Sequence, residues 1–180
     1  MKATGIVRRI DDLGRVVIPK EIRRTMRIRE GDPLEIYTSK EGEVIFKKYS
    51  LMGGVDEFAS QICETLSKST GATVAVTDRD SIIAAAGSAR RDLIGKRISA
   101  QLEQIMEDRG IYQTSPNERS VFVTESLDRY CATIAAPIIS EGDALGLVLF
   151  VGSEGDTNVG ETEYKLAQTI ASFLGKHMEG

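Results

Sequence analysis

The stretch that decides the N-terminal fold reads Leu13-Gly14-Arg15-Val16-Val17-Ile18-Pro19. Its apolar run 16–18 predicts a strand, and residues 5–10 predict a second one, because both segments are rich in β-branched residues. Residues 11–14 between them have turn chemistry, with Gly14 able to take a positive φ. Pro19 suits the first position of a helix, where its missing N–H costs no hydrogen bond. These residues therefore predict two strands around a turn, followed by a short helix.

This helix, which we expect to run to about Arg27, has one cationic face. Positions i, i+3, i+4 and i+7 of a helix fall within an arc of about 100°, and here all four are basic. Arginines of the two preceding strands add further charge. The resulting candidate DNA-binding residues are Lys20, Arg23, Arg24, Arg27, Arg8, Arg9 and Arg15. A basic ridge with few acidic partners is the electrostatic footprint expected for nucleic-acid phosphates.

Charge is distributed unevenly along the chain. Residues 1–50 hold twelve Lys/Arg and eight Asp/Glu, and residues 51–180 hold eleven and nineteen, so the net charge of −4 combines +4 with −8. This asymmetry predicts two domains, a head that binds a polyanion and a body that does not. We expect the head at residues 1–50, a linker at 51–54 and the body at 55–180. Two further strands, 34–38 and 43–47, should form a hairpin in the head.

Fifty residues with two thin hairpins bury little apolar surface. Units of this size usually need disulfides, a metal or a partner chain, and residues 1–50 contain neither cysteine nor histidine. We therefore expect the head to be an obligate homodimer in which strands from two chains complete one barrel.

The head resembles the AbrB family of bacterial transition-state regulators. The resemblance rests on residues 4–19, and continues through residues 21–24, 28–32 and 34–37. It implies an all-β swapped-hairpin barrel formed by two chains, with one short helix, that binds double-stranded DNA through arginines. Matched residue by residue, the family's arginines fall on Arg8, Arg15, Arg23 and Arg24, with Arg9 where the family often has a basic residue. Arg27 departs from the family, many of whose members have glycine there. A left-handed conformation at Arg27 would cost on the order of 1 kcal/mol.

The body alternates helix and strand signals in a defined order. Apolar residues from Val55 to Leu66 recur with helical spacing, and a second helix is expected from Ser99 to about Gly110. A third should begin near Glu161. The expected strands are 72–77, 81–86, 120–124, 130–139 and 144–151. This order predicts an α+β fold, a sheet with helices mainly on one face.

The body resembles a GAF-type sensor domain. The resemblance rests on residues 90–96, on Ala136-Pro137-Ile138 and on Gly146 before an apolar strand. An AbrB-like head on a GAF-like body resembles regulators of sporulation and transition-state genes, which implies an activator or a repressor. The body would then serve assembly or the sensing of a small effector. Apolar stripes on its first and last helices predict pairing of two head dimers into a tetramer, through Phe58, Ile62, Leu66, Ile170, Phe173 and Leu174.

No catalytic constellation emerges from the sequence. Cys63 lies on an apolar helix stripe and Cys131 at the start of an apolar strand, where inert thiols are expected. His177 lies near a helix C-terminus, where it is expected to interact favourably with the helix dipole. We therefore expect no enzyme activity, no cofactor and no metal. Two cysteines and no apolar signal core favour a cytoplasmic, nucleoid-associated protein, and the longest apolar run is about half of what a membrane span needs.

Two alternative functions stay open from the sequence. The first is an antitoxin-type DNA-binding autoregulator with the same kind of head. Such proteins usually end in a short extended tail that wraps a toxin, and the folded body argues against this reading. The second is a cysteine-dependent GAF-fold enzyme such as a methionine sulfoxide reductase. That activity requires a reactive, accessible thiol.

Overall fold

The computed structural model describes residues 5–49, 52, 54–156 and 159–179. The chain divides into two compact units, residues 1–49 and 50–180, here called the head and the body. Of the expected linker 51–54, Leu51 and Gly53 lie outside the described residues. Met52 is 1% exposed and belongs to the apolar core of the body. The body core thus includes a residue that the sequence assigned to the linker.

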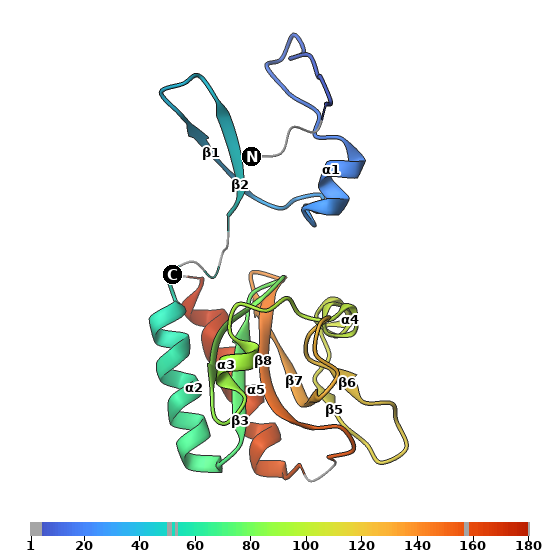
Figure 1. The fold of residues 1–180 in the computed structure, drawn as a ribbon. Helices are drawn as coiled ribbons and strands as arrows, with labels where there is room; N and C mark the ends of the chain where they lie inside the picture. Colours follow the sequence, from blue (N-terminus) through green and yellow to red (C-terminus); the bar gives the residue numbers. More distant parts are fainter. Residues whose placement is uncertain (1–4, 50–51, 53, 157–158, 180) are drawn as a thin grey trace. The chain divides into compact units, whose positions relative to one another are not determined.

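The head consists of one short helix and one hairpin (Figure 1). Helix α1 spans Lys20–Thr25, and strands β1 (Leu34–Thr38) and β2 (Val44–Lys48) pair antiparallel, from Leu34 opposite Lys48 to Thr38 opposite Val44. Residues 5–18, expected to contain two strands, join no strand ladder within the described chain. A strand needs backbone partners, and among the strands of the described residues β1 and β2 pair with each other alone. The apolar side chains of this segment are consequently exposed, Val7 at 89% and Val17 at 69%.

The ends of α1 explain its short length. Pro19 is the N-cap, one position before the place expected for it, and its carbonyl accepts a hydrogen bond from the Arg23 N–H at 2.9 Å. At the other end Arg27 takes a left-handed φ of 51°. Its N–H then bonds to the Arg24 carbonyl at 3.3 Å, and the Ile28 N–H bonds to the Arg23 carbonyl at 2.8 Å. This pair of bonds is the Schellman motif, in which the left-handed position is usually glycine.

The body is built on an antiparallel sheet of order β4-β3-β8-β7-β5, with β6 also paired to β7. Its strands are β3 (Thr73–Thr77), β4 (Ile82–Ala86), β5 (Tyr112–Gln113), β6 (Val121–Phe122), β7 (Tyr130–Ser140) and β8 (Asp143–Ser153). The long strands β7 and β8 are buried over most of their length. A sheet of this kind must be covered on both faces, because side chains alternate between the faces along each strand.

Helices indeed cover both faces of the sheet, whereas the sequence predicted them mainly on one (Figure 1). Helices α2 (Asp56–Thr70) and α5 (Glu161–His177) pack on one face, around Phe150 and Leu174. Helix α4 (Ala100–Asp108) and the short α3 (Arg90–Leu93) pack on the other, around Ile98 and Leu102. Among the described residues, no helix is long and apolar enough to cross a membrane.

Candidate nucleic-acid interface

Three of the candidate DNA-binding residues lie on α1. Lys20 and Arg24 are exposed, and Arg23 is half-buried. The Arg23 Nε has no hydrogen-bond partner among the described groups. The other side of the helix presents Ile22 and Met26 to an apolar cavity. Cations therefore lie on one side of α1, whereas Ile22 on the other side and Met26 at the C-cap line an open apolar cavity.

Arg15 is held at the end of a tight loop by Asp11. The Asp11 Oδ1 accepts hydrogen bonds from the N–H groups of Leu13 (3.0 Å) and Arg15 (2.8 Å), and the Asp11 Oδ2 accepts one from the Arg15 Nε (2.8 Å). These bonds, those of Arg15 foremost, lower the pKa of the Asp11 carboxyl. The Arg15 side chain is still 69% exposed, so its remaining N–H groups point to solvent. The sequence identified Asp11 only as a turn residue, although aspartate side chains in turns commonly accept hydrogen bonds from backbone N–H groups a few residues on.

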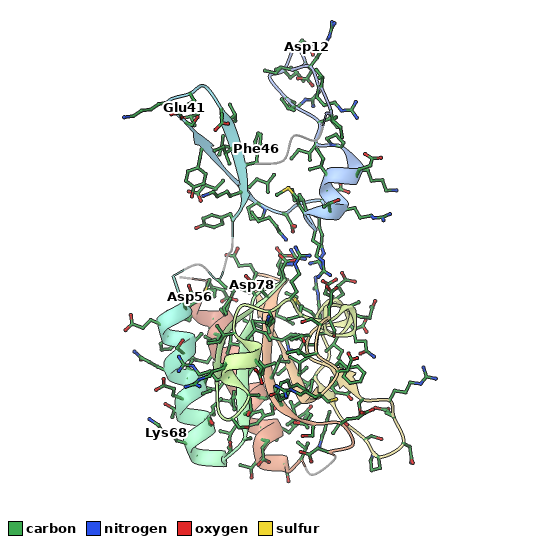
Figure 2. All side chains as sticks on the ribbon, viewed as in Figure 1. Asp12, Glu41, Phe46, Asp56, Lys68 and Asp78 are labelled. Atoms are coloured by element: carbon green, nitrogen blue, oxygen red, sulfur yellow. The ribbon has the colours of Figure 1, made fainter. Side chains whose placement is uncertain are left out.

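The three remaining candidate DNA-binding residues precede the Arg15 loop or follow α1 in the sequence. Arg8 and Arg9 are exposed in the segment 5–10, which leads into the same loop. Figure 2 shows Asp12 at the tip of that loop. Arg27 lies just beyond α1 and is half-buried. The loop and the helix thus present the cations from two adjacent segments of the head.

Lys48 ties the end of α1 to the hairpin. Its Nζ donates a hydrogen bond to the Arg27 carbonyl at 2.9 Å and lies 3.7 Å from the Asp32 Oδ2. The Asp32 side chain is only 5% exposed, and its Oδ2 also accepts a hydrogen bond from the Arg29 N–H at 2.8 Å. Sequence reasoning missed this link, because Lys48 and Arg27 are 21 positions apart and no local pattern joins them.

The head also contains an open apolar cavity of about 470 Å³ between α1 and the hairpin. Figure 2 shows Phe46 on the side of the β1–β2 hairpin that faces α1. The cavity is lined by Ile6, Arg8, Val16, Val17, Ile18, Pro19, Ile22, Met26, Ile28, Val44 and Phe46. An apolar surface of this extent in so small a unit marks an interaction site.

The residues expected to join bodies fall into two groups. Leu66 and Leu174 are 5% and 0% exposed and lie in the body's own core, so they do not reach the surface as expected. Both leucine side chains pack against the sheet of the same chain. Phe58, Ile62 and Ile170 are half-buried, and Phe173 is 49% exposed.

The exposed part of this stripe joins α2 to α5 through aromatic rings. The Phe58 ring centroid lies 5.9 Å from that of Phe173 and 5.2 Å from that of His177. The latter two rings are stacked at 6.2 Å. His177 therefore packs against phenylalanines at the helix end.

Neither cysteine has the properties of a nucleophile. The Cys63 side chain is 0% exposed, and burial raises the pKa of its thiol to about 12. Cys131 is 4% exposed, and burial likewise raises its pKa. No group of three His, Cys, Asp or Glu side chains able to hold a metal occurs in the part of the chain that the structure describes.

Comparison with protein families divides the chain in two. Residues 54–179 match the family described as the C-terminal, transcription-factor domain of stage V sporulation protein T. Residues 7–51 match the family described as the antidote–toxin recognition protein MazE, a bacterial antitoxin.

Two curated relatives come from Bacillus subtilis (strain 168). Stage V sporulation protein T is 47% identical over 180 residues, 99% of both chains. The transition state regulatory protein AbrB is 63% identical over 49 residues, 27% of this chain and 50% of that protein. The AbrB-like head expected from the sequence is thereby confirmed.

The body resembles solved GAF structures. A GAF domain/HD domain protein from Geobacter sulfurreducens matches 73% of this chain and 99% of its own, with a TM-score of 0.52 and 17% sequence identity. This likeness supports the fold of the body, which is GAF-like as the sequence predicted.

Proposed function

The chain belongs to the stage V sporulation protein T family of transcription factors, and from this premise we propose that it regulates transcription by binding DNA in a sequence-dependent way. Transition-state and sporulation genes are the targets that its relatives' names suggest. The observation that carries the proposal is the pair of adjacent basic segments in the head, the Arg15 loop and α1. Because chromosomal DNA is the target, we place its action at the nucleoid in the cytoplasm.

The seven candidate cations would bind DNA in two ways. Guanidinium groups form paired hydrogen bonds with phosphate oxygens and with guanine, whereas lysine acts as a point charge. Arg15, held by Asp11 and exposed, is pre-oriented, so binding would order few of its rotamers. Phosphate contacts would fix the register of the head, and base edges or DNA shape would supply sequence preference.

The uncovered apolar surface of the head supports its dimerisation. Residues 5–18 have no strand partner within the described part of the chain, and the cavity between α1 and the hairpin is open. A second copy of the same segments would supply both backbone partners and apolar side chains, as in the swapped-hairpin barrel. Two heads related by a twofold axis would also present two sets of arginines to a DNA duplex.

The body would join two head dimers into a tetramer. Its partly exposed aromatic and aliphatic stripe across α2 and α5 is the surface proposed for this contact, formed by Phe58, Ile62, Ile170 and Phe173. A small effector bound by the body remains a second proposed role, and it rests on the GAF-like fold alone.

The two alternatives receive less support. An antitoxin would need an extended tail, but residues 56–156 and 159–177 form a folded sheet with helices. A thiol-dependent reductase would need an accessible thiolate, and both cysteines are buried with raised pKa values. We therefore propose a regulator without enzyme activity.

Single substitutions of the arginines test the proposal. Arg8, Arg15, Arg23 or Arg24 changed to Ala should each weaken binding to a genomic fragment by about 1–3 kcal/mol where a base is read. Fluorescence anisotropy measures the affinity, and sedimentation checks that each variant keeps the oligomeric state of the wild type. Lys40→Ala, in the exposed turn of the hairpin, is the matched control. Four variants that all bind like the wild type would refute the assignment of these residues.

A further inference from the structure

A basic patch on the body is not used by the function proposed above. Four cations lie within the eight residues 90–97, and Arg129 joins them through a contact between its guanidinium and the Asp92 Oδ2. The basic patch is defined as Arg90, Arg91, Lys96, Arg97 and Arg129. It holds five of the eleven Lys/Arg in residues 51–180, although this part of the chain is acidic overall.

The fold brings the members of the basic patch together. After α3 the chain turns at Ile94 and Gly95 and runs back along the start of β4. The Gly95 N–H donates to the Ile82 carbonyl at 2.9 Å, and the Ile82 N–H donates to the Lys96 carbonyl at 2.9 Å. Arg97 pairs with Ser81 as an antiparallel bridge. The backbone of 95–97 is thereby fixed at the edge of the sheet, while the side chains of Arg90, Arg91, Lys96 and Arg97 are exposed.

Basic residues outnumber acidic ones within segment 90–97. Asp92 is the one acidic residue of segment 90–97. Its Oδ2 is already engaged by Arg129 and by the Tyr130 hydroxyl, which donates at 2.5 Å. In the described part of the chain, none of the four cations in segment 90–97 forms an ion pair. Five cations against one carboxylate give the patch a formal charge of +4, while the rest of residues 51–180 has eighteen acidic and six basic residues.

The patch borders a hollow whose lining suits phosphate oxygens. Arg90 and Arg91 line this hollow of about 500 Å³ together with Gly87, Ser88 and Ile94. Gly87 has a φ of 104°, and a Cβ there would lie 2.8 Å from the Thr73 Cα, so only glycine allows this approach to β3. Two guanidinium groups and the Ser88 hydroxyl form a set of donors without an acidic neighbour in the lining. Such donors bind phosphate oxygens with charge-assisted hydrogen bonds.

We propose that the basic patch binds the backbone phosphates of duplex DNA, as a second contact surface beside the head. The proposal rests on the proposed function, which makes DNA the polyanion that the protein meets. Charge complementarity selects this occupant, because an exposed patch of +4 on an acidic surface attracts a polyanion locally. Phosphate contacts carry no sequence information, so the patch adds affinity and the head supplies recognition. The body would then bind a polyanion, contrary to the prediction from its net charge.

The test uses the full-length chain with two arginines of the patch neutralised. Arg90→Gln/Arg91→Gln is compared with Arg109→Gln/Arg119→Gln, which removes the same charge from exposed body residues outside the patch. Anisotropy with a genomic duplex is measured between 50 and 200 mM salt, and equal thermal midpoints verify folding. Each lost phosphate contact lowers the log–log salt slope by about 0.9. We expect the slope of the patch variant to fall by about 1–2 with a several-fold loss of affinity, and the control to match the wild type.

Four results would overturn the proposal. Equal losses in both variants would mean that net charge acts at long range without a local site. A patch variant that binds like the wild type, while Arg23→Ala in the head loses affinity, would exclude the patch as a DNA contact. The proposed function would then still stand. Sodium phosphate that stabilises the wild type but not the patch variant against heat, with DNA affinity unchanged, would identify a small-anion site instead. Failure of both Arg23→Ala and the patch variant to change affinity would count against the proposed function as well. Arg97→Gln serves as a second variant if the double substitution unfolds.

Discussion

Arg27 combines a positive charge with an unfavourable backbone conformation. Its φ of 51° closes α1, at a position where glycine has no steric penalty. We expect Arg27→Gly to be more stable than Arg27→Ala by about 1 kcal/mol, since alanine retains the penalty and both changes remove the same side chain. Urea unfolding of the full-length variants measures the difference.

The variants Arg27→Gly and Arg27→Ala also test whether the charge of Arg27 contributes to DNA binding, because both lack the guanidinium and only one retains the backbone strain. Both should bind a genomic fragment more weakly than the wild type, because both lack the guanidinium. Equal stability of the glycine and alanine variants would contradict a strained Arg27, and wild-type affinity in both would remove Arg27 from the interface. Arg29→Ala, two positions further on, is a control for the loss of one charge.

The Cys63 thiol is expected to be inert in the folded protein. Burial raises its pKa to about 12 from an ordinary value of 9.0, so the neutral thiol persists at pH 8. Because the unfolded chain ionises first, Cys63 should reduce stability only as the pH rises above 9. Titration with a thiol reagent at pH 8 should be slow in native protein and fast in denaturant. Rapid native labelling at Cys63, located by peptide mapping with Cys63→Ala as the control, would reopen the reductase alternative.

At the scale of elements, Lys48 of β2 fixes the end of α1. Replacing it with methionine keeps the apolar stem but leaves the Arg27 carbonyl and the buried Asp32 carboxylate without this donor. Loss of a buried hydrogen-bond partner costs about 1–3 kcal/mol. Lys48→Met should therefore destabilise the head by about that amount, measured by urea unfolding, while Lys40→Met in the exposed turn changes little. Similar midpoints for both variants would show that the link does not stabilise the head.

At the scale of the whole molecule, the stripe across α2 and α5 should set the number of chains. Light scattering of the full-length protein should give a mass of about four chains. Phe173→Glu places a charge among the rings of Phe58 and His177 and should halve that mass, because a buried unpaired charge is costly. Gln168→Glu, an exposed change on α5, is the control. A wild type that stays a dimer at all concentrations would exclude the tetramer.

Local patterns in the sequence were sufficient to predict much of this protein. The motif at residues 13–19 identified the head, and helical spacing predicted the cationic side of α1. Polar and turn residues marked the start of α5 at Glu161 and of α4 after Ser99. These features depend on neighbours within a few positions, so the order of residues determines them directly.

Other features were decided only by the tertiary structure. Helical periodicity placed Leu66, Leu174 and Phe173 on apolar stripes, but only packing against the sheet shows that the leucines belong to the core and that Phe173 is exposed. Likewise, β-branched residues in 5–18 predicted strands, but strand pairing needs backbone partners, and the described residues of this chain supply none. The Lys48 link and the basic patch join residues from 21 to 39 positions apart. Sequence patterns describe which side of an element is apolar or charged, whereas contacts between distant elements depend on how the whole chain packs.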